Sequence, residues 1–493
     1  KSCDSQGYRF ERGNSMTRRG RRAADPASWG VQTEYVDALG KRRKAGAETV
    51  AALLEALGAT PGGPPDDGPL VIEQGDALPR AGSIQLEDGG EMAVPERSAT
   101  VPLGYHRLLQ PTGESRELIV VPTGCHPPLP GRRWGWAAQL YSVRSADSWG
   151  IGDLHDLRAL GRWSAGHGAS FILINPLHAV LPATPQQPSP YFPSSRRFSN
   201  PVYLHIEDVP GARDDPEVVA LGQRGRALNR TPEIRRDEVH RLKSAALERL
   251  FHRAQPDRRL DSFIRARGEP LARYAAFCVA AEQRGVPWSH WPQSLRHPDG
   301  AGVARIRNRE PDRVRFHSWL QLLLEEQISR AGREVSVMHD LAIGVDPDGA
   351  DAWWWQDSFV TAARVGAPPD EFATQGQDWG FPPFHPFRLR SAGYRPFIET
   401  LRGSVRQGGG LRLDHVMGLF RLWWIPEGCA PADGAYVTYP WRDLLGILAL
   451  ESVRAGCQVV GEDLGTVESS VRDELRRRGV LSYRLGWFEE DPP

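Results

Sequence analysis

The chain has 493 residues, which predicts two or three units, one of them large enough for a barrel or a doubly wound sheet. Lys plus Arg and Asp plus Glu both number 61, and this balance excludes a field that would recruit nucleic acid or an acidic membrane. The five cysteines form no CxxC pair, so reduced thiols in a cytoplasmic protein are expected rather than a zinc site. The sequence contains no run of about 18 apolar residues, the length that would predict a membrane-spanning helix.

Residues 1–130 are predicted to form an N-terminal extension made of a small helix and a mainly-β domain. The stretch "AETVAALLEALG" (47–58) has helical spacing and a Gly stop, and "PGGPPDDGP" (61–69) is typical of a linker. Short apolar segments such as "LVIEQ", "SIQLEDGG" and "ELIVVP" follow, each bounded by Gly, Pro or Asp. The sequence indicates no function for this extension.

Residues 131–493 alternate strand-like and helical segments, which is the pattern of an α/β fold built from repeated βα units. Six strands are expected, at 135–143, 169–179, 334–345, 410–415, 457–465 and 480–488. A charged stretch at about 207–330 contains helical patches such as "EVHRLKSAALERLFHRA" and is expected to be a helical insertion. Its basic residues are interspersed with acids, which favours solvated helix faces over a binding patch.

Two acidic residues end neighbouring predicted strands. Asp414 ends the fourth strand and Glu462 the fifth, 462 − 414 = 48 residues later, a suitable length for one crossover. In a parallel barrel both side chains would face the site at the carboxyl ends of the strands. One nucleophile and one proton donor roughly 5 Å apart are the minimal apparatus of a retaining glycosidase.

Two alternatives remain open at this point. Arg412 shares a strand face with Asp414, so the pair could be an ordinary structural ion pair; as part of a site, Arg412 would favour the ionised nucleophile. Strand alternation also does not decide whether Glu462 or its neighbour Asp463 faces inward.

Five motifs occur in order along the chain: "WGIGDLHDL", "SPYFPSSRRFSNPVY", "APPDEFATQGQDWGFPPF", "LRLDH" and "GEDLG". Together they resemble the 4-alpha-glucanotransferases, or amylomaltases, of the alpha-amylase superfamily, over about residue 134 to the end. The resemblance implies a (β/α)8 TIM barrel with helical insertions. It also implies Asp414 as the nucleophile and Glu462, rather than Asp463, as the general acid/base.

The same resemblance implies substrate-binding roles for six further residues. Arg412 would hold the nucleophile and the sugar, Tyr191 would stack on that sugar, and Asp340 would bind its hydroxyl groups. The remaining three, Asp370, Gln377 and Trp379, fall in a loop that would cover acceptor sugars. Without the resemblance, Tyr191 packing against its neighbouring prolines would be the simpler interpretation.

The implied reaction transfers a segment of an α-1,4-glucan, such as a maltooligosaccharide, to the 4-hydroxyl of another glucan without a metal or organic cofactor. His339 with Asp340 lacks a third metal ligand at a useful spacing. The family also carries a third acid in a "THD"-type motif, which does not follow Glu462 here, so we expect a missing C-terminal segment and an incomplete barrel. An α-glucan hydrolase and a non-catalytic glycan-binding fragment are the alternative functions.

Overall fold

The computed structural model describes residues 24–486 except 38–39, 79–81, 95–96, 98–99, 255–256, 406–408 and 465–466. Cys3, the first 23 residues of the expected extension, Gly465 of the expected fifth strand and the last two residues of the sixth lie outside the described residues. Within the part of the chain that the structure describes, no helix is long and apolar enough to cross a membrane.

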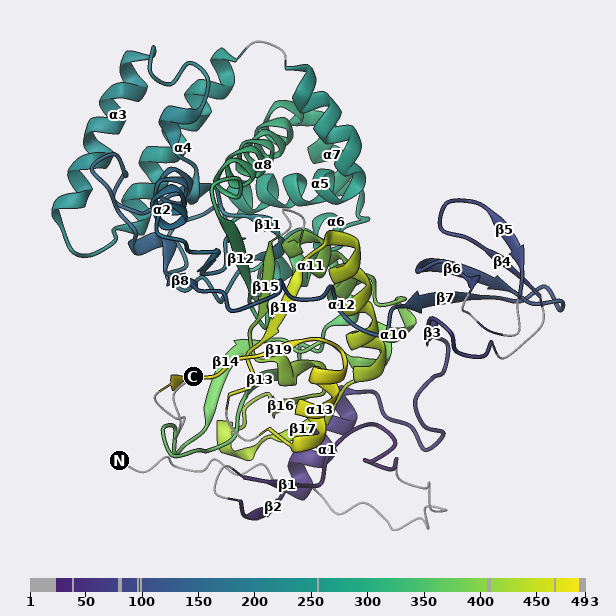
Figure 1. Ribbon diagram of the computed structural model, residues 1–493. Coiled ribbons are helices and arrows are strands. Elements are labelled where there is room, and N and C mark those ends of the chain that lie inside the picture. The colour runs from purple at the N-terminus through teal and green to yellow at the C-terminus, as the bar shows by residue number, and fades with distance from the viewer. Residues whose placement is uncertain are drawn as a thin grey trace, which may run out of the picture.

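The central sheet contains all six predicted strands of the βα region. Its order follows the chain, and every neighbouring pair is parallel (Figure 1). The strands are β8 (Gly135–Ala138), β9 (Phe171–Ile174), β12 (Ser336–Leu341), β15 (Gly410–Leu413), β18 (Gln458–Gly461) and β19 (Leu481–Ser482). The fold is therefore mixed α/β. The closed (β/α)8 barrel is not seen in the described residues, because β8 and β19 each have one neighbour in this sheet.

Helices pack against the apolar side chains of this sheet. Leu411 and its register partner Val459 are fully buried and belong to the same hydrophobic cluster as residues of α11 and α12. The covering helices include α2 (Leu154–Gly166), α11 (Arg395–Val405) and α12 (Trp441–Ala455). At the start of α2 the Asp153 side chain accepts hydrogen bonds from two backbone N–H groups in a capping box. The motif "WGIGDLHDL" thus has a local structural role.

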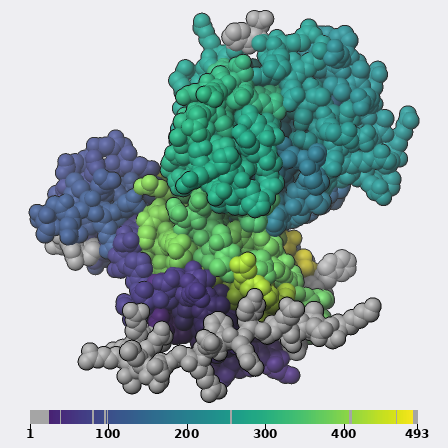
Figure 2. All heavy atoms as spheres, turned by 180° about the vertical axis from the view of Figure 1, so that it is seen from behind, coloured from purple at the N-terminus to yellow at the C-terminus, as the bar shows by residue number. Residues whose placement is uncertain are grey.

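The chain between β11 (Ser195–Ser199) and β12 forms a lobe of helices (Figures 1 and 2). Its helices are α3 (Pro216–Ala227), α4 (Arg236–Arg253), α5 (Arg258–Arg284), α6 (Gln293–Arg296), α7 (Ala301–Arg309) and α8 (Pro311–Ala331). The long α5 has a break in its helical geometry at Gly268, which has φ +57° and precedes Pro270. These helices lie in the stretch where charged helical patches were expected.

A second, antiparallel sheet lies beyond the carboxyl ends of the central strands. It contains β13 (Ala363–Ala367), β14 (Gln377–Phe381), β16 (Arg421–Pro426) and β17 (Ala435–Thr438), in the order β14-β13-β16-β17. The remaining short elements are β10 (His178–Ala179), which pairs with β11, and the helices α9 (Ala350–Trp354), α10 (Pro386–Ser391) and α13 (Ser469–Arg477).

The described residues before β8 form two separate parts of the molecule. A five-stranded sheet, β3 (Leu70–Glu73), β7 (Ser115–Val121), β6 (Gly104–Leu109), β4 (Ser83–Gln85) and β5 (Glu91–Ala93), has its own small core and projects from the side (Figure 2). The hairpin β1 (Glu34–Val36) and β2 (Arg42–Lys44) and helix α1 (Ala47–Ala56) lie instead beside the antiparallel sheet. Leu53 and Leu57 join the same buried cluster as Trp424.

Candidate active site

The carboxyl ends of β12, β15 and β18 bring the predicted catalytic residues together. Asp340 and Arg412 are direct neighbours in the sheet register, and Leu413 pairs with Gly461. Asp414 and Glu462 are each the first residue after their strands. Since parallel strands end at one edge of the sheet, these four polar side chains emerge at the same place.

Arg412 links two carboxylates at this edge. Its Nη1 donates to Asp340 Oδ1 at 2.6 Å, and its Nη2 lies 3.1 Å from Asp414 Oδ1. The Tyr191 hydroxyl donates to the other Asp340 oxygen at 2.7 Å. The chain of contacts fixes Tyr191, Asp340, Arg412 and Asp414 relative to one another, as charge-assisted hydrogen bonds do.

Glu462 and Asp463 lie on opposite sides of their strand. Glu462 accepts hydrogen bonds from the backbone N–H groups of His415, at 3.2 Å, and Leu464, at 2.8 Å. Asp463 is 3% exposed and accepts from the Ser482 hydroxyl at 2.6 Å and the Tyr483 N–H at 2.9 Å. Geometry therefore puts Glu462 beside the Asp414 loop and Asp463 against β19.

His415 has an uncommon backbone conformation between the two acids. Its φ of +48° and ψ of +65° lie in the left-handed region, which is unfavourable for a side chain with a Cβ. This conformation accompanies the hydrogen bond from the His415 N–H to Glu462 Oε2. The residue in this conformation therefore supplies one of the two backbone N–H groups that hold Glu462. We predicted no role for His415 from its place in the motif "LRLDH".

Burial dominates the electrostatics of the two aspartates. It raises the pKa of Asp340 to about 6, against the opposing effects of Arg412 and the Tyr191 hydrogen bond. Burial also raises the pKa of Asp414; Arg412 lowers it, and the nearby Glu462 carboxylate raises it further. Arg412 thus favours ionised Asp414, as expected, but the net shift is upward because desolvation and a second carboxylate outweigh one guanidinium.

The loop that leads through β14 borders this group of residues. The Trp379 ring stands edge-on to His415, with centroids 5.3 Å apart, and its Nε1 donates to Gln377 Oε1 at 3.0 Å. Phe381 packs on Phe192, with ring centroids 5.1 Å apart. Trp379 and Gln377 therefore flank the residue that follows Asp414.

Asp370 occupies a different position in the same loop. Its carboxylate accepts hydrogen bonds from the backbone N–H groups of Phe372, at 2.8 Å, and Ala373, at 2.5 Å. Phe372 is 90% exposed. The hydrogen bonds of the Asp370 side chain thus stabilise its own turn, and they do not join it to the residues at the strand ends.

Tyr483 is a further neighbour that the sequence did not single out. Arg412 Cζ lies 5.3 Å from the centre of its ring, within the range of a cation–π contact. The expected sixth strand contained Tyr483, but alternation along a strand of two residues carries no signal for its orientation.

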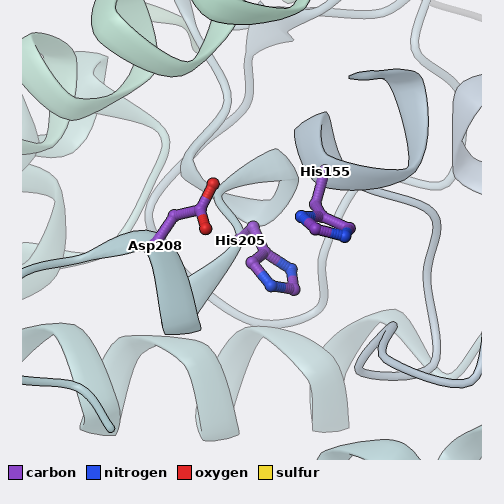
Figure 3. A group of neighbouring side chains, drawn as sticks. All are labelled: His155, His205 and Asp208. Carbon is purple, nitrogen blue, oxygen red and sulfur yellow. The ribbon is translucent and has the colours of Figure 1, made fainter. Parts of the chain in front are cut away.

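One group of side chains in the described residues has the residue types of a metal site. Atoms of His155, His205 and Asp208 that could bind a metal lie within 4.8 Å of one another (Figure 3). The two imidazoles, however, stack at 4.3 Å with an angle of 23° between their planes. Since nitrogen lone pairs lie in the ring plane, stacked rings do not direct them at one ion. His205 Nδ1 lies 3.2 Å from Asp153, so His205 already has a carboxylate partner.

Residues 138–493 match the family model described as 4-alpha-glucanotransferase, glycoside hydrolase family 77. The chain belongs to the 4-alpha-glucanotransferase family. It is therefore an enzyme of the glycosyltransferase type, and the matched region includes β9 to β19 and every residue of the candidate site.

Relatives and solved structures agree with this assignment. The 4-alpha-glucanotransferase of Mycobacterium tuberculosis (strain ATCC 25618 / H37Rv) is 41% identical, over 94% of this chain and 74% of the relative. That of Haemophilus influenzae is 37% identical, over 79% of this chain and 61% of the relative. The crystal structure of amylomaltase from Corynebacterium glutamicum superposes with a TM-score of 0.80 at 33% identity, over 94% of this chain and 75% of the other. Amylomaltase from Streptococcus agalactiae, in complex with acarbose, shares the fold, with a TM-score of 0.62 at 19% identity, over 71% of this chain and 73% of the other.

Proposed function

We propose that this 4-alpha-glucanotransferase works by retaining double displacement, with Asp414 as nucleophile and Glu462 as general acid/base. The observation that carries the proposal is the pair of acids on adjacent strand ends, of which Asp414 is held by Arg412 at 3.1 Å. A structural ion pair would not require a second acid, Glu462, close enough to affect the pKa of Asp414.

The reaction then has two steps with one proton passing through Glu462. Asp414 attacks the anomeric carbon of the donor, the bond to the leaving glucan breaks, and Glu462 gives its proton to the leaving oxygen. The 4-hydroxyl of an acceptor glucan next attacks the covalent glycosyl ester, Glu462 takes the hydroxyl proton, and Asp414 leaves as the carboxylate. The steps use side chains alone, and no metal or organic cofactor enters them.

The neighbouring residues supply recognition in this proposal. Tyr191 would stack on the donor sugar at the cleavage site, and Asp340 and Arg412 would bind its hydroxyl groups. Trp379 and Gln377 would cover the acceptor side and exclude water, which favours transfer over hydrolysis. The contact of Trp379 with His415 supports this role.

Further predictions belong to the same proposal. Asp370 would take part through movement of its loop toward the acceptor. The substrates would be maltooligosaccharides and other α-1,4-glucans, in the cytoplasm. The catalytic domain would follow residue 130 and form a (β/α)8 barrel, which the six parallel strands in chain order support.

Incubation with maltotriose tests the reaction type. A transferase makes glucose together with longer maltooligosaccharides, whereas the hydrolase alternative makes only shorter sugars, and a glycan-binding fragment makes neither. Trapping with a 5-fluoro-α-glucosyl fluoride, followed by peptide mass spectrometry, tests the nucleophile. A label on any residue other than Asp414 contradicts the assignment.

A further inference from the structure

Tyr483 is the first residue after β19, just as Asp414 and Glu462 are the first residues after β15 and β18. It therefore emerges at the same edge of the parallel sheet. Arg412 Cζ is 5.3 Å from the centre of its ring, and Arg412 contacts both Asp340 and Asp414. The two steps of the proposed reaction give Tyr483 no part, although its ring contacts the arginine that holds the nucleophile.

Hydrogen bonds to Asp463 fix the backbone at Tyr483. Asp463 Oδ1 accepts from the Tyr483 N–H at 2.9 Å, and Oδ2 accepts from the Ser482 hydroxyl at 2.6 Å. Arg472 Nε lies 3.6 Å from the same Oδ2. Since Asp463 is buried, these bonds compete little with water and restrict the end of β19. The carboxylate that follows Glu462 therefore fixes the point from which the Tyr483 ring extends.

The contacts of Arg412 can use different parts of its guanidinium group. Nη1 donates to Asp340 Oδ1 at 2.6 Å, and Nη2 lies 3.1 Å from Asp414 Oδ1. A guanidinium binds carboxylates along its edges and aromatic rings on its faces, so the Tyr483 ring can act together with both carboxylates. The Arg412 side chain is only 12% exposed, which strengthens the attraction between cation and ring because little water competes with it.

The two carboxylates do not hold Arg412 equally. The contact with Asp340 is the shorter one, and the Asp340 side chain is 4% exposed, against 24% for Asp414. Charges attract more strongly where less water surrounds them. With these two contacts alone, the guanidinium would be drawn toward Asp340 and away from the nucleophile. A third contact, on the ring of Tyr483, opposes that movement.

We propose that Tyr483 is a positioning residue whose ring keeps the Arg412 guanidinium in contact with Asp414 as well as with Asp340. Tyr483 acts through Arg412 and does not touch the reacting atoms. The benefit to catalysis rests on the proposed function, in which Asp414 is the nucleophile. The effect of the ring on the Asp414 carboxyl does not, so the two can be tested separately.

Tyr483→Leu removes the ring, and the Asp414 carboxyl reports the result. Arg412 lowers the pKa of Asp414, so a guanidinium that moves away should let this pKa rise. The other titratable groups that act on Arg412 and Asp414 stay in the variant: Asp340, Tyr191, Glu462 and His415. Infrared titration measures the change, with the spectrum of Asp414→Asn in the same background subtracted to isolate this carboxyl. An unchanged midpoint in Y483L would overturn the proposal.

Two control variants separate the position of Arg412 from the stability of the fold. Tyr483→Phe keeps a ring, so the Asp414 midpoint should equal that of the unaltered protein; a shift as large as in Y483L would assign the effect to the hydroxyl and contradict the proposal. Tyr105→Leu removes a ring with the same kind of contact elsewhere, since Arg402 Cζ and Arg454 Cζ each lie 5.0 Å from its centre. Y105L should lower the melting temperature and leave the Asp414 midpoint unchanged. Equal midpoint shifts in Y105L and Y483L would indicate general loosening of the fold and contradict the proposal.

Kinetics measure the consequence for glucan transfer. At pH 7 kcat/KM of Y483L should fall by about two- to fivefold. Because attack requires ionised Asp414, the loss should grow at lower pH, and the acid limb of the kcat/KM profile should move to higher pH. A rise in KM with an unmoved Asp414 midpoint would make Tyr483 a sugar contact and overturn the proposal. A moved midpoint with an unchanged profile would confirm the positioning of Arg412 and contradict the assignment of Asp414 as nucleophile.

Discussion

Two clusters in this molecule are built from the same side-chain types but differ in their roles. The strand-end cluster contains Tyr191, Asp340, Arg412, Asp414 and Glu462. The interface cluster, between β6 of the N-terminal sheet and helices α11 and α12, contains Tyr105, Glu451, Arg402, Arg454 and Glu87. In each, a tyrosine hydroxyl donates to a buried carboxylate, at 2.7 Å from Tyr191 to Asp340 and at 2.6 Å from Tyr105 to Glu451. In each, an arginine binds the same carboxylate.

The balance of charge separates the two clusters. In the interface cluster two arginines face two glutamates: Arg402 binds both oxygens of Glu451 at 3.0 Å, and Arg454 pairs with Glu87. Despite its partial burial, the Glu87 pKa is lowered, by Arg454 and a backbone hydrogen bond.

The strand-end cluster as defined above has three carboxylates and one arginine, which contacts Asp340 and Asp414. Burial raises the pKa of Asp340 and Asp414, and Arg412 does not fully compensate. Paired charges are sufficient to hold a domain interface, whereas an excess of buried acids is costly to stability and is typical of a site that moves protons. The comparison teaches that charge imbalance, not the presence of ion pairs, distinguishes the two regions.

The largest expected difference follows from removing one carboxylate charge in each cluster. Asp414→Asn should lower turnover by several orders of magnitude and leave maltooligosaccharide binding largely in place, because covalent attack is lost and recognition is kept. Glu451→Gln should leave turnover near normal and lower the melting temperature. Steady-state kinetics, calorimetric binding and thermal unfolding measure these effects. Near-normal transfer by D414N would remove the assigned nucleophile.

The adjacent acids Glu462 and Asp463 allow a catalytic carboxylate to be distinguished from a structural one. Glu462→Gln should also lower turnover by several orders of magnitude, because the proton donor is lost. Asp463→Asn should keep most activity but lower the melting temperature, since its carboxylate binds Ser482 and Tyr483 of the β19 segment. If D463N is the inactive variant and E462Q the active one, the assignment of the acid/base is reversed.

Removing one hydroxyl from each cluster should give a smaller difference. Tyr191→Phe keeps the ring but loses the hydrogen bond to Asp340, and we expect kcat/KM to fall by about tenfold, equivalent to about 1.4 kcal/mol. Tyr105→Phe should lower the free energy of unfolding by about 1 kcal/mol, with unchanged kcat/KM. Urea unfolding and initial rates check both variants, and equal kinetics for the two would show that the Tyr191 hydroxyl, as distinct from its ring, contributes nothing to recognition.

The last expected effect is a pH dependence of stability. The Asp340 pKa is about 6 in the folded protein and about 3.8 as its ordinary value, so the folded state binds more protons between these pH values. The free energy of unfolding should therefore decrease as pH rises from about 4 to 6, because the folded protein must release a proton that it holds more tightly than the unfolded chain does. Asp340→Asn removes this titrating group. The stability of the variant, compared with that of the unaltered protein at the same pH, should therefore increase as pH rises over that range. Urea midpoints at pH 4.5 and 7 measure it, and parallel pH profiles would contradict it.

The sequence by itself determined the βα region and the ends of its strands. Leu411 and Leu413 alternate with Arg412, which indicates a strand with one apolar face, and the polar residues that follow such strands mark the edge where the candidate site forms. The ordered motifs indicated the family, and they also indicated the acids, because motif residues at strand ends need no long-range information to be located.

Tertiary structure decided what depends on contacts between distant segments. The His415 backbone N–H binds Glu462, and the Ser482 hydroxyl binds Asp463. These contacts set the directions of the two side chains, and strand alternation does not encode them. The raised pKa of Asp414 is the net result of burial and of the neighbouring Arg412, Glu462 and His415, where the sequence suggested only Arg412. Helix α1 packs with Trp424 rather than in the N-terminal sheet, because hydrophobic contacts carry no record of chain order.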